Sequence, residues 1–377
     1  MKLITQIDRD CTIAGKEIQD NSGFNKSGWL YRGILIGTQA FCVKGKLLAF
    51  IFRTLFLVCL GMTAYNENAI SQPIPSKDEN IPFLVTFGSN SLTEWGDDDF
   101  CQIFFFVYPQ SQTEPVYLRI FDPDIGGKSD EMRGTADTKV RFSVYGGQGT
   151  YSNDDIKNKE PVNGYNGGNL LATKVFGEDP KYDGKWYTMG PFNPTEGELK
   201  PNLGGYIIKI IAEGVSGDDG NLYKYFFSTI PDGNKPLEGG NAFTYEYTFR
   251  LNPDPGIMSH IYPFVDNQVI SVKQYNFDFD NDCYIRIVSR AKKGLKVPMS
   301  NEGNWVTSQH GIDDAERNSS LDIQMIKTGT RSNNNVVFYI TNQYGKFLPF
   351  YSVPIGGVPK YVFNINAEKI SKKTTKN

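Results

Sequence analysis

A close grouping of carboxylates lies in the segment Tyr117–Tyr145. An apolar run there ends in Asp122-Pro-Asp124, and Gly126-Gly127 and Asp130 follow soon after. Calcium takes about six to eight oxygen ligands, and glycines let a loop curl around an ion because they accept positive φ. The spacing therefore predicts a calcium-binding loop. An ordinary solvated loop with Asx turns and a catalytic carboxylate pair are also consistent with it.

A second acidic run, Asp97-Asp98-Asp99, comes directly before a predicted strand. If the predicted strands Phe100–Tyr108 and Val116–Phe121 pair as a hairpin, this run lies at the same sheet end as Asp122 and Asp124. Carboxylates gathered in this way repel one another unless a cation lies among them. The predicted calcium ligands are Asp97, Asp98, Asp99, Asp122, Asp124 and Asp130.

Two further acidic runs have other interpretations. The segment Gly217–Asn221 contains favoured turn pairs, so it is predicted to be a hairpin turn between Gly205–Glu213 and Leu222–Ser228. The run Asp278–Asp282 superficially resembles the opening of an EF-hand. The glycine and glutamate that such a loop requires are replaced by Cys283 and Ser289, so an EF-hand is excluded.

Catalytic constellations are sparse. The chain has only two histidines, His260 and His310, and both are predicted to lie in surface loops. Zinc sites and catalytic triads need clustered His or Cys, and no nucleophile elbow, P-loop or HExxH motif is present. A glycosidase would need two facing carboxylates, and the sequence offers Glu246 without an identifiable partner. These observations favour a protein that is not an enzyme.

Aromatic residues leave a second function open. Trp95 and Trp186 lie near predicted loops or strand ends, where rings can stack on sugars or peptides or can cap the core. A carbohydrate-active enzyme or its sugar-binding accessory protein is therefore the alternative to a structural or binding role.

Short runs of alternating apolar and polar residues follow residue 70, and turn-forming residues separate them. This period of two is typical of strands with one face in a core. The chain is predicted to be all-β, with two tandem antiparallel β-sandwich (jelly-roll-like) domains after an N-terminal signal segment. The predicted strands are Phe83–Phe87, Phe100–Tyr108, Val116–Phe121, Val140–Tyr145, Leu170–Phe176, Lys185–Met189, Gly205–Glu213, Leu222–Ser228, Phe243–Leu251, Val269–Phe277, Cys283–Ser289, Leu321–Lys327, Val336–Asn342, Phe347–Pro354 and Tyr361–Asn364.

The predicted domains are bounded by a leader, a proline-rich break and a tail. Residues 75–252 form the larger sandwich and 260–367 the smaller one, because Asn252-Pro-Asp-Pro-Gly256 cannot continue a strand ladder. The basic end, 368–377, is predicted to be disordered.

Residues 1–72 are interpreted as a leader. Lys44 and Lys46 precede an apolar stretch over residues 47–64, which is typical of a secretory signal peptide. A retained N-terminal anchor and an interfacial segment are alternatives, and true initiation near Val43 would explain the long preceding stretch. The protein is therefore expected to be exported, to the periplasm, the outer membrane or the extracellular space. Contact with a membrane is expected only through the leader, if the leader is not cleaved.

The charge of the chain limits the classes of partner, and its cysteines have two interpretations. The chain has 39 Lys and Arg against 42 Asp and Glu, which argues against nucleic acid because phosphate contacts need basic patches. Cys101 and Cys283 lie in apolar strand patterns, where they are interpreted as buried thiols, with a disulfide between them as the alternative.

Three stretches carry a resemblance: Tyr117–Ser152, AEGVSGDDGNLYKYFFST and FTYEYTFRL. They resemble an uncharacterised β-sandwich module of secreted or envelope proteins of Bacteroidota, over about residues 80–251. Some such proteins are similar to outer-membrane proteins with an OmpA-like domain. The resemblance implies an envelope location and no particular activity. This chain shows no OmpA-like helical segment, so cell-wall anchoring is not implied.

The expected function is that of an exported, non-catalytic binding or structural protein of the cell envelope, with calcium stiffening its Asp-rich loops. Its ligand would be a glycan or a protein outside the cytoplasm.

Overall fold

The computed structural model describes residues 73–157, 165–329 and 334–362, and these residues are all-β, as predicted. The helices of this described part are 3-10 turns: η1 Thr93–Trp95, η2 Asp154–Lys157, η3 Pro194–Glu196, η4 Pro201–Leu203 and η5 Asp314–Glu316. None of the helices in these ranges is long and apolar enough to cross a membrane. The predicted leader (1–72) and tail (368–377) lie outside the described residues.

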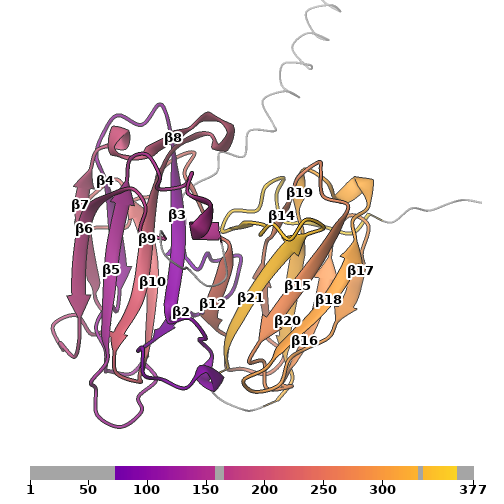
Figure 1. Cartoon of the computed structure of the whole chain (residues 1–377), viewed down its shortest axis with the longest axis horizontal. Coiled ribbons are helices and arrows are strands. Elements are labelled where there is room, and N and C mark those ends of the chain that lie inside the picture. Colours follow the sequence, from indigo (N-terminus) through magenta and orange to yellow (C-terminus); the bar gives the residue numbers. More distant parts are fainter. Residues whose placement is uncertain (1–72, 158–164, 330–333, 363–377) are drawn as a thin grey trace, which may run out of the picture. The chain divides into compact units, whose positions relative to one another are not determined.

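The largest sheet has nine antiparallel strands (Figure 1). Its main path is β18-β15-β21-β12-β2-β10-β4-β7, and β1 also pairs with β10. The bounds are β1 Pro73–Ile74, β2 Phe83–Phe87, β4 Val116–Phe121, β7 Trp186–Phe192, β10 Gly220–Ser228, β12 Glu246–Arg250, β15 Ser271–Phe277, β18 Trp305–Gly311 and β21 Asn335–Asn342.

A second sheet has seven strands in the order β22-β11-β3-β9-β5-β6, with β8 paired to β9. Its strands are β3 Cys101–Pro109, β5 Lys139–Gly146, β6 Asn169–Phe176, β8 Glu198–Lys200, β9 Gly205–Ser216, β11 Asn241–Thr244 and β22 Phe350–Tyr351. Two smaller sheets are built from β13 Met258–Ile261, β16 Cys283–Val288, β17 Lys293–Val297 and β20 Asp322–Lys327, and from β14 Phe264–Val265 and β19 Ser319–Ser320.

Aromatic side chains fill the space between the two large sheets. Phe104 and Phe106 on β3 and Tyr225 and Phe227 on β10 alternate with residues of the opposite face, and all four are buried. The rings of Phe104 and Tyr225 meet edge to face, with centroids 5.9 Å apart. Such pairs contribute beyond their buried area because the edge of one ring meets the negative face of the other.

Three predictions of local pairing are wrong. β3 pairs with β9 and β11, whereas β4 pairs with β10 and β7. The predicted hairpin between β3 and β4 therefore does not form. The segment Gly217–Asn221 is not a hairpin turn, because β9 and β10 belong to different sheets. The predicted strand Phe243–Leu251 divides at Tyr245, where the chain passes from the seven-stranded to the nine-stranded sheet.

Strand pairing crosses the predicted domain boundary. β12, before the boundary, pairs with β21, after it, over five residue positions from Glu246↔Tyr339 to Arg250↔Asn335. Strands from both sides of the predicted boundary thus belong to one sheet. The division into two tandem domains stays a prediction. The last predicted strand, Tyr361–Asn364, extends beyond the described residues.

The histidines and cysteines have definite places. Both histidines lie on strands rather than in loops: His260 is in β13 and hydrogen-bonds Asp322, and His310 is in β18. β18 was missed because its sequence, WVTSQHG, has few apolar residues for the alternation to mark. Cys101 and Cys283 are both free thiols.

Candidate metal centre

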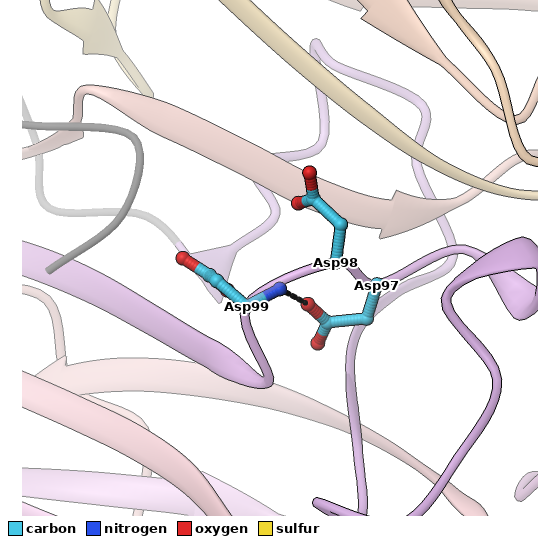
Figure 2. Close-up of side chains that lie close together, drawn as sticks. All are labelled: Asp97, Asp98 and Asp99. Carbon is cyan, nitrogen blue, oxygen red and sulfur yellow. Dashed lines mark hydrogen bonds between the residues drawn. The ribbon is translucent and has the colours of Figure 1, made fainter.

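The turn between η1 and β3 carries Asp97, Asp98 and Asp99. One carboxylate oxygen of each lies within 4.8 Å of the others. Figure 2 shows the three side chains leaving the turn in different directions. Neither Asp122 nor Asp124 joins this group, because the hairpin that would place them there does not form.

The side chain of Asp97 closes this turn by accepting hydrogen bonds from backbone amides of the turn. The carboxylate is 1% exposed. Its Oδ1 atom accepts hydrogen bonds from the amides of Phe100 at 2.9 Å and Asp99 at 3.3 Å, and Oδ2 accepts one from Phe87 at 3.3 Å. Burial raises the pKa of Asp97 to about 7, and the neighbouring charge of Asp98 adds to the rise. Oδ1 thus serves the turn, which itself has a positive φ at Phe100, and Oδ2 ties the turn to β2.

The other two carboxylates of the run also have partners within the protein. Asp98 accepts a hydrogen bond from Trp305 Nε1 at 3.0 Å, and Asp99 accepts one from the Cys101 amide at 2.9 Å. Burial raises the pKa of Asp99, and the Glu246 carboxylate is the next largest cause. The hydrogen bonds that Asp97 and Asp99 accept from nearby amides are those of an Asx-type turn.

A second acidic group, which sequence reasoning treated as a turn, combines Asp137, Asp218 and Asp219. The fully buried Asp219 accepts hydrogen bonds from the backbone amides of Arg133 at 2.7 Å, Asp137 at 3.2 Å and Thr138 at 3.3 Å. Its carboxylate therefore anchors the loop that leads into β5.

The other three predicted ligands lie beside the end of β4, where their charges act on one another. We use the name Asp122 cluster for Asp122, Asp124, Asp130, Asp183 and Asn221. The first three belong to the loop after β4, Asp183 to the loop before β7, and Asn221 to the start of β10. The ladder explains the meeting, because β4 lies between β7 and β10.

Asp122 is held at the sheet edge by the loop before β7. Its amide donates to the Lys185 carbonyl at 2.9 Å, and its Oδ1 atom accepts a hydrogen bond from the Gly184 amide at 2.7 Å. The residue is 1% exposed and has a φ of 56°, which turns the chain sharply after β4. The second carboxylate oxygen, Oδ2, is buried and accepts no hydrogen bond of normal geometry from the described residues. The Ser129 hydroxyl lies close enough to this carboxylate to oppose the rise in its pKa.

Two more side-chain oxygens of this cluster are buried without a partner. Asp124 is 2% exposed, and its Oδ1 atom accepts no hydrogen bond from the part of the chain that is described. Asn221 donates from Nδ2 to the Pro123 carbonyl at 2.9 Å, between the two aspartates in sequence, and its Oδ1 atom has no donor there either. Leaving a buried acceptor unsatisfied costs about 1–3 kcal/mol, and more for a charged group.

Asp130 and Asp183 complete the cluster differently. Asp130 accepts hydrogen bonds from the amides of Gly126 at 2.8 Å and Leu222 at 2.7 Å, so it closes the loop and ties it to β10. The Asp183 carboxylate lies against Gly127, where a Cβ would come within 2.2 Å of Oδ1. The glycine is therefore required for this approach, and its φ of 71° adds to the requirement.

Electrostatics show a local excess of negative charge. Burial raises the pKa of Asp124 to about 6 and of Asp130 to about 9, and the charge of Asp122 contributes to both. Burial also raises the pKa of Asp122, and the Asp183 carboxylate adds to that rise. A divalent cation at this place would offset the repulsion and favour the ionised forms.

These raised pKa values predict how stability depends on pH. A carboxyl whose pKa is higher in the folded protein binds protons more tightly there, so the free energy of unfolding falls as pH rises through that window. In a chelator, the Tm should fall by at least about 5 °C between about pH 5 and pH 8, since one pKa unit corresponds to about 1.4 kcal/mol. Scanning calorimetry at several pH values measures this. A Tm that rises over the range would contradict the raised pKa values.

The six sequence-predicted ligands therefore fall into two groups. Asp122, Asp124 and Asp130 lie close enough for the charges of the first two to raise the pKa of Asp130. Among the described residues, the acidic groups with one carboxylate oxygen each within 4.8 Å of the others are Asp97, Asp98 and Asp99, and Asp137, Asp218 and Asp219. Sequence reasoning missed Asp183 and Asn221, which the ladder β7-β4-β10 brings to the cluster from other parts of the chain. Comparison with known proteins identifies no matching family model and no significantly similar curated protein.

Proposed function

We propose that this protein is an exported, non-catalytic binding protein of the cell envelope whose Asp122 cluster binds calcium. The observation that carries the calcium proposal is the set of buried, unpartnered oxygens on Asp122, Asp124 and Asn221. Elsewhere in the described chain, Asp97 and Asp219 accept hydrogen bonds from backbone amides through their carboxylates.

The donor set favours calcium over other metals. Carboxylate and amide oxygens are hard ligands, which suit calcium and magnesium and do not suit zinc or copper, for which nitrogen or sulfur is preferred. The cluster is assembled from three loops and strand ends, and this irregular arrangement suits the flexible coordination of calcium better than the strict octahedron of magnesium. Bound calcium would join the ends of β4, β7 and β10.

Export and envelope location rest on the sequence. The apolar stretch over residues 47–64 with its preceding lysines supports a secretory signal, and the resemblance to Bacteroidota envelope modules points the same way. Extracellular fluids hold calcium concentrations at which sites with Kd values of about 10⁻⁴–10⁻³ M are occupied. A binding role is supported by the scarcity of histidine and the absence of a nucleophile motif in the sequence.

Isothermal titration of the full chain, after treatment with a chelator, tests the metal proposal. We expect one calcium per chain and much weaker binding of magnesium. Absence of calcium binding at millimolar concentration, or an equal preference for magnesium, would overturn it.

A further inference from the structure

A groove of about 440 Å³ lies beside strands β1, β7 and β10. No residue of the Asp122 cluster is among the residues that line it. Its volume falls within the range of small-molecule sites, about 300–1,000 Å³. The lining residues are Pro73, Pro75, Ser76, Lys77, Asn80, Ile81, Pro82, Trp186, Lys224, Phe226, Asn234 and Asn252.

The charged residues in the lining of this groove are lysines. The chain has more acidic than basic residues, yet the lining described above contains Lys77 and Lys224 and no Asp or Glu. Beside it, the buried Arg119 donates to Asn234 and Thr188, and the charge of Asp232 also acts on its guanidinium. The charged side chains of the lining itself are therefore both cationic, which favours an anionic ligand.

Lys224 is the most informative of these cations. Its ammonium group lies over the rings of Phe83 at 4.4 Å and Phe121 at 5.9 Å, and it has no carboxylate or hydrogen-bond acceptor among the described residues. The side chain is half-buried, and burial lowers the pKa of Lys224. A half-buried ammonium without a counter-ion is costly, and an anion in the groove would offset that cost.

An indole ring adds a flat apolar surface. Trp186 lines the groove, and the Arg119 guanidinium lies over its ring, 5.2 Å from the centroid. Phe121 and Phe226 contact the same indole, with centroids at 5.3 and 6.4 Å, and hold its orientation. A fixed, partly exposed ring of this kind suits the apolar face of a sugar.

Three amide side chains supply polar contacts of both kinds. Asn80 donates from Nδ2 to the Met258 carbonyl at 2.7 Å. Asn234 accepts through Oδ1 from Arg119, and Asn252 accepts through Oδ1 from the Asp254 amide at 3.2 Å. Each amide is thus oriented by one end, and its other end makes no hydrogen bond within the described chain. Sugar hydroxyls both donate and accept, so they match such a set.

We propose that this groove binds an acidic saccharide, with the sugar ring on Trp186, its carboxylate at Lys224 and its hydroxyls at the three asparagines. The inference rests on the proposed role as a binding protein but does not need the calcium. It names sugars that carry a carboxylate, such as uronates and sialic acids, as the ligand class.

The test is titration of the full chain with a panel of oligouronates and sialyl oligosaccharides, in the presence of a chelator so that failure of the calcium proposal does not affect it. We expect binding to at least one acidic sugar and at least tenfold weaker binding of the same sugar after its carboxyl groups have been reduced to alcohols. That comparison uses the wild-type protein, so it does not depend on the folding of a variant.

Two variants localise the site. Lys224→Met removes the ammonium and keeps an apolar stem, and we expect at least a tenfold loss of affinity. Lys174→Met is the matched control, because Lys174 also lies over a ring, that of Phe176 at 5.7 Å, but is outside the groove. No binding to any acidic sugar, equal binding of the carboxyl-reduced sugar, equal loss in both variants, or tighter binding of an acidic peptide would overturn the proposal.

Discussion

Replacing Asp122 and Asp124 together with asparagine should abolish stabilisation by calcium. Asparagine keeps the shape of each side chain and the acceptor for the Gly184 amide, but it removes both charges that the ion requires. Calcium at about 100 times its Kd adds about 2.7 kcal/mol to wild-type stability, or about 5 °C or more in Tm. Differential scanning calorimetry with calcium and with a chelator should show this rise in the wild type and none in the variant.

Two matched variants test whether the ion lies at the proposed place. Asp98→Asn with Asp99→Asn removes two charges from the first acidic group, and Asp137→Asn with Asp218→Asn removes two from the second. Both should keep the calcium-dependent rise in Tm. If either control loses it while the Asp122 and Asp124 variant keeps it, the ion belongs to that other group and the Asp122 cluster is not the site.

The substitution Glu131→Ala should lower the free energy of unfolding by about 3–5 kcal/mol, because it leaves a buried guanidinium without its carboxylate. Glu131 lies in the loop after β4 and meets Arg250 of β12 at 2.6 Å, with side-chain exposures of 8% and 12%. Its Oε2 atom also accepts a hydrogen bond from Asn335 of β21 at 2.7 Å. The residue thus fastens the acidic loop to strands on both sides of the predicted domain boundary.

Urea denaturation in the presence of a chelator measures this loss without a contribution from calcium. Asp154→Ala is the control, because its carboxylate is 95% exposed in the ion pair with Lys157. Exposed pairs contribute about 0–1 kcal/mol, so this variant should unfold almost as the wild type does. A loss below about 1 kcal/mol for Glu131→Ala would show that the protein tolerates Arg250 without it.

Acidic residues illustrate how far sequence reasoning reaches. The segment Asp122–Asp130 could be identified as a candidate calcium loop, because aspartates and glycines at close spacing are visible in the chain itself. Asp97 and Asp219 have the same side chain, yet their oxygens are occupied by backbone amides. Composition cannot separate these cases, since the separation depends on which amides the folded backbone brings within reach.

The sequence by itself determined the all-β class and most strand positions, because alternation of side chains along one strand is a local property. β2 and β4 begin and end at the residues that the alternation predicts. The tertiary structure alone decided which strands pair, and it rejected the hairpin of β3 and β4. Pairing depends on burying the faces of distant strands together, so only the fold could bring Asn221 and Asp183 to Asp122, or Trp186, Lys224 and Asn252 to one groove.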